Sequence, residues 1–256
     1  GEIADGIDGM GVRAVFVAGP SSSGKTTFSN RLCIHLRVLG KKPVLISLDD
    51  FYRNREDLPL EADGEPDLEA LSSLDVSYFQ SCMQKLLSGE EALLPSFDFS
   101  VAKRKEEYKP LRLEEGQILV IEGIHGLNPA LHQGLKPGAV AKVYISELTC
   151  LNLDNHNRIR TTDARLLRRI VRDKQFRNTK PEETLKMWNS VRRGEEKWIF
   201  PYQEEADFMF NSALHYELPV LKKYVYQTLM EIPPEDSCYP VSYTHLRAHE
   251  TRGNLV

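Results

Sequence analysis

The stretch AVFVAGPSSSGKTTFSNRL, residues 14–32, decides the fold class. It opens with an apolar run typical of a buried strand and closes with Phe28 and Leu32 at helical spacing. Between them, Gly19 to Thr26 match the pattern G-x-x-x-x-G-K-[ST]. A strand before this pattern and a helix after it form the context of a phosphate-binding loop, so a mere glycine-rich turn is the weaker interpretation. The sequence therefore predicts that the chain binds a polyphosphate.

The residue types of this turn suit an anion. Two glycines permit backbone conformations that a Cβ would block, and the helix that follows adds the positive end of its dipole. We expect the lysine to reach the outer phosphates and the first threonine hydroxyl to complete a magnesium shell. The predicted nucleotide-binding residues are Gly19, Ser21, Ser22, Ser23, Gly24, Lys25, Thr26 and Thr27.

Strand and helix patterns alternate along most of the chain. Apolar runs predict further strands at residues 43–48, 117–123, 141–146 and 206–211, and helical periodicity predicts helices over Lys25–Leu39, Leu74–Leu87 and 219–230. This alternation is typical of a parallel sheet with helices on both faces, in which ligands bind at the carboxyl ends of the strands. We therefore predict an α/β fold of the P-loop NTPase class.

Acidic side chains follow two of these strands. Asp49 and Asp50 end the second apolar run, and Glu122 follows ILVI. Phosphate transfer to an alcohol needs an aspartate beside the acceptor hydroxyl. Asp49 is the better candidate for this base, because Asp50 suits a turn cap or a solvent contact. A structural role for both aspartates is the alternative. We expect Glu122 to contact magnesium through water.

Arginines recur at helical spacing in the last third of the chain. Arg165, Arg168, Arg169 and Arg172 fall at i, i+3, i+4 and i+7, which places them on one helix face. The face could be a solvated charge run, a nucleic-acid patch, or a lid whose guanidinium groups neutralise a transferred phosphate. We favour the lid, because a phosphate cradle is present and the net charge of −4 disfavours nucleic acid.

Composition fits a soluble globular protein. The 256 residues are 41% hydrophobic, and no apolar run approaches the roughly 20 residues of a membrane helix. The four cysteines are far apart with no C-x-x-C pair, which argues against a zinc site or a disulfide framework. We therefore expect a reducing, cytoplasmic compartment and no membrane partner. A homo-oligomer is compatible with the sequence.

Six motifs stand in the order of one known family. GPSSSGKTTFSNRL, LDDFYR, PSFDF…KRKEE, LVIEGIHGLNP, TDARLLRRIVRD and GEEKWIFPYQEEADFMFNSAL resemble the uridine kinase/phosphoribulokinase family, in its bacterial uridine kinase-like (nucleoside kinase) branch. The likeness covers about residues 15–224. It implies a nucleoside-monophosphate-kinase-like P-loop fold with an arginine-rich lid, ATP as phosphate donor and Mg²⁺ as cofactor.

The same resemblance assigns roles. It implies that Asp49 is the catalytic base beside Lys25, and that Glu122 is an acid of the metal site. It places Arg165, Arg168 and Arg169 in the lid helix. The residues that it implies for the acceptor side are Tyr52, Phe97, Phe99 and Arg104. His125, in EGIHGLNP, is either a further acceptor contact or a hydrogen-bonded loop histidine.

Two positions depart from the family pattern. Uridine kinases read the pyrimidine with a histidine shortly after the D-F dipeptide, where residues 100–102 read Ser-Val-Ala. A ribose-binding acid is replaced by Ser72, with Glu69 and Asp75 nearby. Both departures weaken uridine as the acceptor and leave the phosphate chemistry intact. The prediction is an ATP-dependent kinase for a small-molecule hydroxyl, first of all a nucleoside. The alternatives are another sugar-like acceptor, or a non-catalytic ATP-binding module that regulates or binds RNA.

We also predict three segments. Residues 1–12 look like the end of an upstream region or a linker, and residues 13–237 form the kinase domain. From Cys238 onward the apolar periodicity is lost, and residues 238–256 resemble the translation of sequencing-adapter DNA, so a non-native tail is expected. A genuine irregular C-terminus is the alternative.

Overall fold

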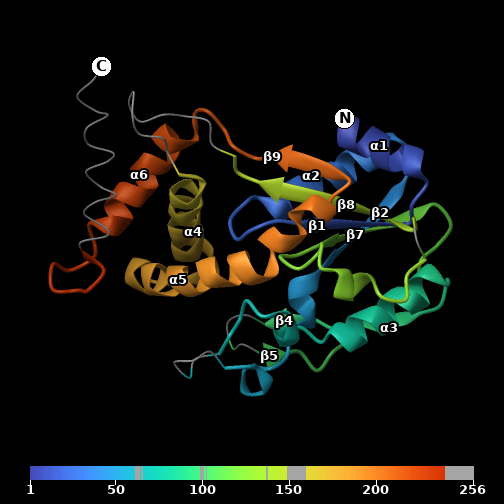
Figure 1. Ribbon diagram of the computed structural model, residues 1–256, viewed down its shortest axis with the longest axis horizontal. Coiled ribbons are helices and arrows are strands. Elements are labelled where there is room, and N and C mark those ends of the chain that lie inside the picture. The colour runs from blue at the N-terminus through green and yellow to red at the C-terminus, as the bar shows by residue number, and fades with distance from the viewer. Residues whose placement is uncertain are drawn as a thin grey trace. The chain divides into compact units, whose positions relative to one another are not determined.

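The computed structural model describes residues 1–60, 64, 66–98, 101, 103–136, 138–148 and 160–239. Phe99 and all but the first two residues of the predicted tail lie outside these ranges. The chain forms two compact units, Gly1–Ser146 with Arg193–Phe210, and Glu147–Arg192 with Asn211–Val256. The change of unit at Arg192 falls inside helix α5, Pro181–Trp198 (Figure 1).

The first unit is built on a five-stranded sheet in the order β2-β7-β1-β8-β9 (Figure 1). The strands are β1 (Ala14–Ala18), β2 (Lys42–Ser47), β7 (Gln117–Glu122), β8 (Val140–Ser146) and β9 (Phe208–Asn211). Strands β2, β7, β1 and β8 pair in parallel. All five residues of β1 are buried, which explains its unbroken apolar run. The sheet confirms the predicted α/β fold.

Helices cover both faces of this sheet. They are α1 (Glu2–Met10), α2 (Lys25–Val38) and α3 (Val76–Leu87). Successive side chains of a strand point to opposite faces. Val15 accordingly packs in a core cluster with residues of α1 and α2, whereas Phe16 packs in another with residues of α3. In α1, Ile7 is fully buried in this core, so the segment that we predicted as the end of an upstream region or a linker contributes to the packing of the first unit.

Short elements surround the sheet. A 3-10 turn, Leu48–Phe51, follows β2 directly. Two small antiparallel pairs join β3 (Ala92–Leu94) to β6 (Lys109–Leu111), and β4 (Phe97–Asp98) to β5 (Lys103–Arg104). Further single 3-10 turns lie at Arg55–Asp57, Leu71–Ser73, Pro129–His132 and Phe200–Glu205.

The described residues of the second unit are mainly helical. It contains α4 (Thr161–Arg177), the first part of α5, and α6 (Glu217–Leu229). Its core includes Ile170, Trp188 and Val225, all buried. Helix α4 is capped at its C-terminus by Asn178, whose φ of 51° is left-handed, a conformation that asparagine tolerates. Cys238, at the start of the predicted tail, belongs to this core.

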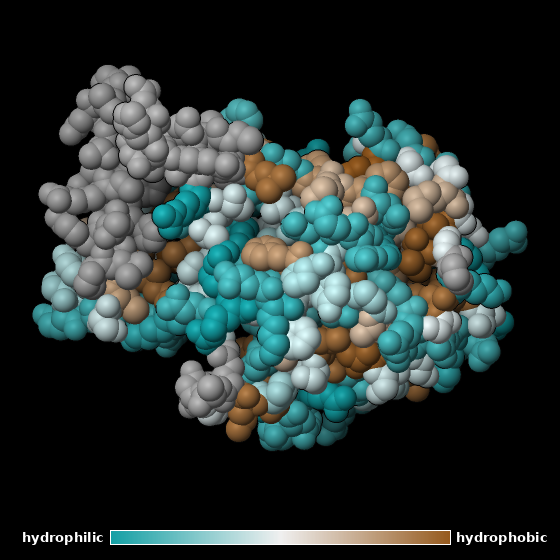
Figure 2. Space-filling view, in the orientation of Figure 1, coloured by the Kyte–Doolittle hydropathy of each residue, from teal (hydrophilic) through white to brown (hydrophobic). Residues whose placement is uncertain are grey.

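The surface mixes side chains of both kinds. On the face shown in Figure 2, hydrophobic residues lie among hydrophilic ones. No helix in the described ranges has both the length and the apolar character that a membrane span requires. Cys33, Cys82 and Cys238 are buried free thiols, and Cys150 lies outside the ranges that the structure describes.

Candidate active site

The glycine-framed loop between β1 and α2 has the backbone that a phosphate cradle needs. Gly24 is the N-cap of α2 and has a left-handed φ of 89°. Gly19 has a φ of 155°, and a Cβ there would lie 1.9 Å from the Ile145 carbonyl oxygen. Ser22 adopts a positive φ of 60°, which is uncommon outside glycine. The loop is therefore held in a conformation that its two glycines make possible.

Substitution of Gly19 by alanine should disrupt this loop. The new Cβ would collide with backbone atoms of β8, which no side-chain rotation relieves. We expect Gly19→Ala to lower the free energy of unfolding by about 3 kcal/mol and the Tm by roughly 6–12 °C. Gly9→Ala in α1 is the matched control, because nothing lies within 4 Å of that position and alanine favours helices. Equal melting temperatures of the two variants would contradict this interpretation.

Lys25 folds back over the start of the loop. Its Nζ donates to the carbonyl oxygens of Gly19 and Pro20, each at 3.0 Å. On the other side of the same loop, the Ser21 amide donates to Oε1 of Glu195 at 3.1 Å. Glu195 lies near the end of α5 and is fully buried. The loop is thus tethered by a cation and by a carboxylate.

Glu122 links this loop to the neighbouring strand end. In the parallel register it lies opposite both Val17 of β1 and Ser47 of β2. Its Oε1 accepts hydrogen bonds from Thr26 Oγ1 at 3.2 Å and from Ser47 Oγ at 3.3 Å. The side chain is 9% exposed. These contacts bring a helix-start hydroxyl and a strand-end carboxylate together at the carboxyl edge of the sheet.

This pair fits a magnesium ion. Thr26 and Glu122 offer two oxygen donors side by side, and Mg²⁺ prefers a few protein oxygens while keeping several waters. Within the described residues there is no group of three or more His, Cys, Asp or Glu side chains that would form an all-protein cage. The donor set is therefore of the kind that holds magnesium together with phosphate oxygens.

The two aspartates after β2 differ in their contacts. Asp50 Oδ1 accepts a hydrogen bond from the Phe97 amide at 3.1 Å, so its carboxylate fixes the start of β4. The Asp49 amide donates to Ser47 Oγ at 3.3 Å, the same hydroxyl that contacts Glu122. The Asp49 side chain is partly exposed. A structural role is thus visible for Asp50, while Asp49 is linked through its amide to the serine that contacts Glu122 and is partly exposed.

The residues predicted for the acceptor side lie on the segment that follows. The rings of Tyr52 and Phe97 are adjacent, with centroids 5.9 Å apart, and the Tyr52 hydroxyl donates to the Leu68 carbonyl at 2.9 Å. Phe99 lies outside the described residues. Two aromatic rings of the predicted set therefore meet beside the 3-10 turn that carries Asp49.

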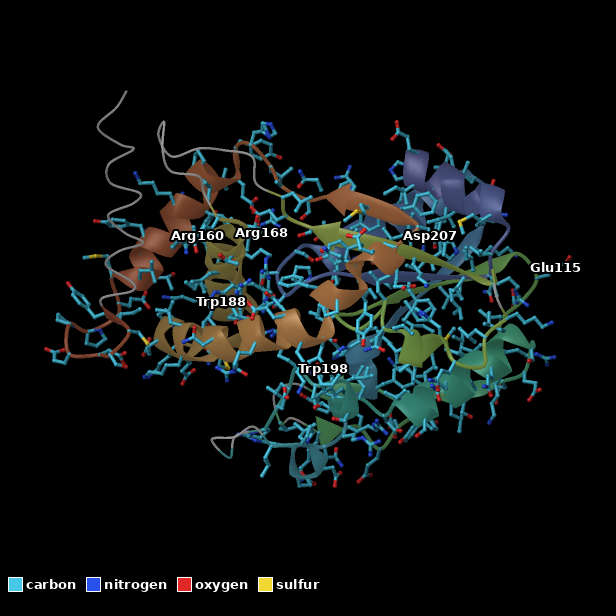
Figure 3. The ribbon with its side chains drawn as sticks, in the orientation of Figure 1. Glu115, Arg160, Arg168, Trp188, Trp198 and Asp207 are labelled. Carbon is cyan, nitrogen blue, oxygen red and sulfur yellow. The ribbon has the colours of Figure 1, made fainter. Side chains whose placement is uncertain are left out.

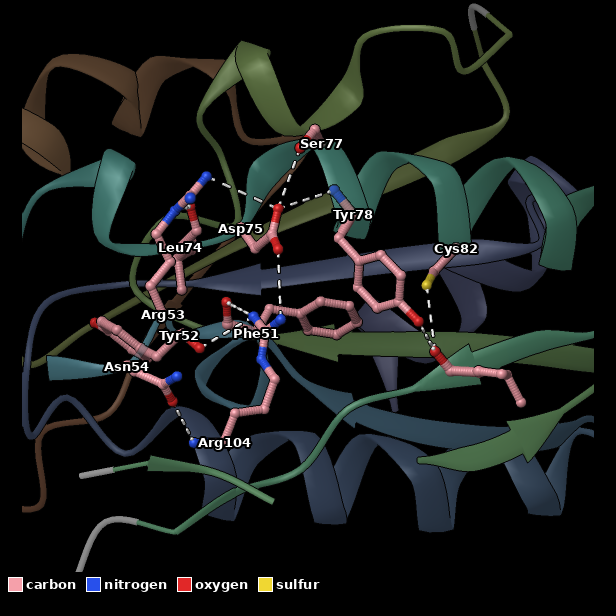
Figure 4. A network of polar contacts seen from close by, with 11 residues as sticks. Phe51, Tyr52, Arg53, Asn54, Leu74, Asp75, Ser77, Tyr78, Cys82 and Arg104 are labelled. Atoms are coloured by element: carbon pink, nitrogen blue, oxygen red, sulfur yellow. Dashed lines mark hydrogen bonds and ion pairs between the residues drawn. The ribbon is translucent and has the colours of Figure 1, made fainter. Parts of the chain in front are cut away.

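Arg104 is engaged with protein groups rather than directed to open space (Figure 4). Its Nη2 donates to the carbonyl oxygens of Phe51 and Tyr52 at 3.0 and 3.1 Å, and its Nη1 donates to Asp75 Oδ2 at 3.4 Å. Its amide donates to Asn54 Oδ1 at 2.9 Å. These contacts hold the end of the Asp49 turn in place, which is a positioning role that the sequence did not indicate.

The Asp75 carboxylate is likewise engaged in hydrogen bonds with protein groups. It is the N-cap of α3, and its Oδ1 accepts from the Tyr78 amide at 3.2 Å and from Ser77 Oγ at 3.1 Å (Figure 4). Burial alone would raise the pKa of this carboxyl, but these hydrogen bonds, with the charges of Arg104 and Arg53, lower it overall. Asp75 is thus an ionised cap, so it is a poor replacement for the ribose-binding acid of uridine kinases.

His125 lies three residues beyond Glu122 and is 1% exposed. Neither ring nitrogen has a partner in hydrogen-bonding geometry among the residues that the structure describes. Burial lowers the pKa of His125 to about 4, the Glu69 backbone opposes that shift, and the charge of Lys25 adds to it. His125 is therefore a buried neutral imidazole close to the Glu69 backbone, and both interpretations of it, an acceptor contact or a loop histidine, stay predictions.

This histidine should make stability pH-dependent. Because its folded pKa of about 4 lies below the ordinary 6.5, the folded state loses stability as the pH falls from 6.5 toward 4. Between pH 7 and pH 5 we expect His125 to account for a loss of about 2 kcal/mol in the free energy of unfolding. In urea titrations at pH 7 and pH 5, the free energy of unfolding of His125→Gln should therefore fall by about 2 kcal/mol less than that of the wild type. Identical pH dependence of the two proteins would contradict the assignment.

The predicted lid arginines lie on α4 in the second unit, and Figure 3 labels Arg168 among them. Arg165 is 1% exposed, and its guanidinium carbon lies 5.5 Å from the centroid of the Trp188 ring. Arg168 Nη2 donates to Glu217 Oε2 at 2.6 Å, and Arg169 pairs with Asp173 at 3.2 Å. Arg165 and Arg169 are buried, so a solvated charge face is wrong for these two. A phosphate-binding role stays a prediction.

Two residues of this site were missed from the sequence. Ser47 is the hydroxyl that joins Glu122 to Asp49, and its place at the end of an apolar run before two aspartates was a usable signal. Glu195 had no such signal. It stands in an acidic pair within a charged helix, 174 positions from the serine that it contacts.

Curated relatives match most of this chain at low identity. The chain is 26% identical over 198 residues to a uridine kinase of Halobacterium salinarum, covering 77% of this chain and 78% of that protein. It is 25% identical over 194 residues to a uridine kinase of Staphylococcus epidermidis, covering 75% of this chain and 84% of that protein. It is 27% identical to uridine kinase-like protein 5 of Arabidopsis thaliana, covering 75% of this chain but only 37% of that longer protein.

Solved structures share the fold. A structure described as a possible uridine kinase of Bacillus stearothermophilus aligns with a TM-score of 0.54 at 18% identity, covering 82% of this chain and all of that chain. D-glycerate 3-kinase of Cryptococcus neoformans aligns with a TM-score of 0.51 at 15% identity, covering 79% of this chain and 82% of that one. The phosphate cradle and the strand-end acids thus stand on a fold shared with solved kinases.

The sequence profile that matches this chain spans both units. It covers residues 14–218, from the first residue of β1 to the start of α6, and therefore includes the loop, the strand-end acids and helix α4. Its description is the phosphoribulokinase/uridine kinase family. With the cradle, the acids and most of the chain inside that match, this protein belongs to the phosphoribulokinase/uridine kinase family.

Proposed function

We propose that this protein is an ATP-dependent kinase that phosphorylates a hydroxyl group of a small molecule, with nucleosides as the first acceptors to test. One observation carries the proposal. Glu122 accepts hydrogen bonds from Thr26 of the phosphate loop and from Ser47, whose hydroxyl also accepts the Asp49 amide. The phosphate-binding loop and the candidate base are therefore joined through one carboxylate.

In the proposed reaction, Asp49 accepts the proton of the acceptor hydroxyl. The acceptor oxygen forms a bond to the terminal phosphorus of ATP, and the bond from that phosphorus to the bridging oxygen breaks, which releases ADP. The loop amides and Lys25 hold the phosphates and stabilise the charge on the transferred group. Thr26 and Glu122 would hold the magnesium ion, which supplies further neutralisation of phosphate charge when bound.

Several residues are proposed to contact the acceptor. Tyr52 and Phe97 offer two adjacent rings beside the Asp49 turn, a surface that suits a planar or sugar-like group. The ring nitrogens of His125 are buried and lack a partner in good hydrogen-bonding geometry among the described residues, so we assign His125 to a hydroxyl of the acceptor. On α4, we propose that Arg168 exchanges Glu217 for phosphate oxygens when nucleotide binds.

The RNA-binding alternative has less support. A nucleic-acid patch needs accessible cations, whereas Arg165 and Arg169 are 1% and 8% exposed. The same side chains are also engaged with Trp188 and Asp173. We therefore keep the small-molecule acceptor as the proposal and treat RNA binding as an outcome to be measured.

An acceptor panel tests the proposed function. Magnesium-ATP is incubated with the protein and with single nucleosides, sugars or glycerate, and products are identified by mass spectrometry as gains of one phosphate group. We expect one acceptor class to be phosphorylated and Lys25→Ala to abolish that product. The proposal fails if no acceptor gains phosphate while the protein binds RNA tightly in 150 mM salt.

A further inference from the structure

Glu195 and Lys25 contact opposite ends of one peptide group. The Pro20 carbonyl oxygen accepts from Lys25 Nζ at 3.0 Å, and the amide of the next residue, Ser21, donates to Glu195 Oε1 at 3.1 Å. These two atoms belong to the same peptide unit, and no cis peptide bond occurs in the part of the chain that is described. In a trans peptide the C=O and the N–H point in opposite directions. The Ser21 N–H therefore points toward Glu195, and the Pro20 C=O of the same peptide points the opposite way, toward Lys25.

From this arrangement we infer that Glu195 is a positioning residue for Lys25, acting through the Pro20–Ser21 peptide. The inference rests on the proposed role of Lys25 in holding ATP. The preceding peptide, Gly19–Pro20, has no N–H and offers only a carbonyl. Pro20–Ser21 is therefore the first peptide of the loop whose amide can donate a hydrogen bond to a side chain such as Glu195. While Glu195 keeps that amide, the Pro20 carbonyl faces Lys25; rotation of the peptide would break both contacts.

The position of Glu195 is fixed by its surroundings. The residue before it, Gly194, approaches Glu69 so closely that a Cβ there would lie 2.2 Å from Glu69 Cβ. After it, Trp198 (labelled in Figure 3) and Ile199 pack in one cluster with Ala18, which immediately precedes Gly19. The end of α5 is thus anchored on the strand that carries the loop. Glu195 itself is 0% exposed, so its carboxylate has little freedom to move away from Ser21.

The hydrogen bond from the Ser21 amide to the Glu195 carboxylate is of a strong kind. A buried carboxylate requires hydrogen-bond donors, because an unpaired one is costly inside a protein. A hydrogen bond from a neutral amide to a charged carboxylate is stronger than a neutral one. Loss of this bond releases the Ser21 amide from Glu195, and rotation of the peptide then breaks the contact between Lys25 and the Pro20 carbonyl.

The test measures ATP affinity by calorimetry in the full chain without any acceptor. We expect Glu195→Ala to weaken ATP binding about tenfold, in line with the loss of one charge-assisted hydrogen bond. Glu195→Gln keeps a side-chain oxygen that can accept from Ser21 and should bind within about threefold of the wild type. Glu196→Ala is the matched control, since it removes the neighbouring exposed carboxylate, and it should bind like the wild type.

A double variant distinguishes positioning from general damage. If Glu195 acts through Lys25, then Glu195→Ala added to Lys25→Ala should change ATP affinity no further. Additive losses would overturn the inference, and so would wild-type affinity in Glu195→Ala. Should that variant not fold, Glu195→Asp decides, because it keeps the charge and withdraws the carboxylate by one methylene. Wild-type affinity in Glu195→Asp would overturn the inference.

The same measurements separate this inference from the proposed function. If Lys25→Ala alone leaves ATP affinity unchanged, the proposed phosphate grip fails, and the inference falls with it. If Lys25→Ala weakens binding while Glu195→Ala binds like the wild type, only the positioning role of Glu195 fails.

Discussion

Lys25→Ala is expected to weaken ATP binding by about 10- to 100-fold, which corresponds to the loss of charge-assisted hydrogen bonds to phosphate. It should also reduce phosphate transfer at saturating ATP by about 1000-fold, because the ammonium stabilises charge that develops on the transferred group. The structure places this ammonium against the Gly19 and Pro20 carbonyls at the start of the loop. Calorimetry and steady-state kinetics measure the two effects separately.

Lys41→Ala is the matched control for that experiment. Lys41 lies just beyond α2 and pairs with Asp8 at 2.7 Å, with more than a third of each side chain exposed. The variant makes the same change of charge away from the loop, so ATP affinity and turnover should stay within about twofold of the wild type. If the two lysine variants behave alike, the role assigned to Lys25 is contradicted.

Asp49→Asn is expected to stop transfer while sparing the nucleotide. An asparagine cannot take the proton of the acceptor hydroxyl, so the transfer rate should fall by about 10²- to 10⁴-fold. ATP affinity should stay within about threefold, because the loop amides and Lys25, not this carboxylate, are proposed to hold the phosphates. Single-turnover kinetics with a fixed acceptor, together with ATP calorimetry, measure these two quantities.

The neighbouring aspartate supplies the control. Asp50 accepts a hydrogen bond from the Phe97 amide, and an asparagine oxygen at that position can accept the same bond. Asp50→Asn should therefore keep most of the transfer rate. Loss of transfer in Asp50→Asn together with a normal rate in Asp49→Asn would reverse the assignment of the two carboxylates.

Much of the fold could be predicted because it depends on local patterns. Both faces of β1 are buried, so its sequence is an unbroken apolar run, and the parallel sheet follows from several such runs alternating with helices. The first twelve residues were harder to place. Glycines at positions 6 and 9 and a short apolar stripe do not show that Ile7 becomes fully buried, since that depends on packing with distant strands.

Part of the candidate site could also be predicted, because it depends on local sequence patterns. The phosphate loop and Glu122 lie next to apolar runs, so their place at the sheet edge follows from the strands. The contacts of Arg104 and Glu195 join residues that are 52 and 174 positions apart. Such pairings depend on tertiary structure, and charged side chains in polar segments look alike in sequence whether they face solvent or hold a backbone group.

The most direct test of the proposed phosphoryl transfer follows the terminal phosphate itself. ATP labelled in its γ-phosphate is mixed with wild-type protein and the acceptor panel, and the label is located after a single turnover. We expect the label on a hydroxyl of one acceptor class, and on none with Asp49→Asn. Label that appears only in inorganic phosphate, or stays in ATP with every acceptor while ATP is bound, would contradict the account.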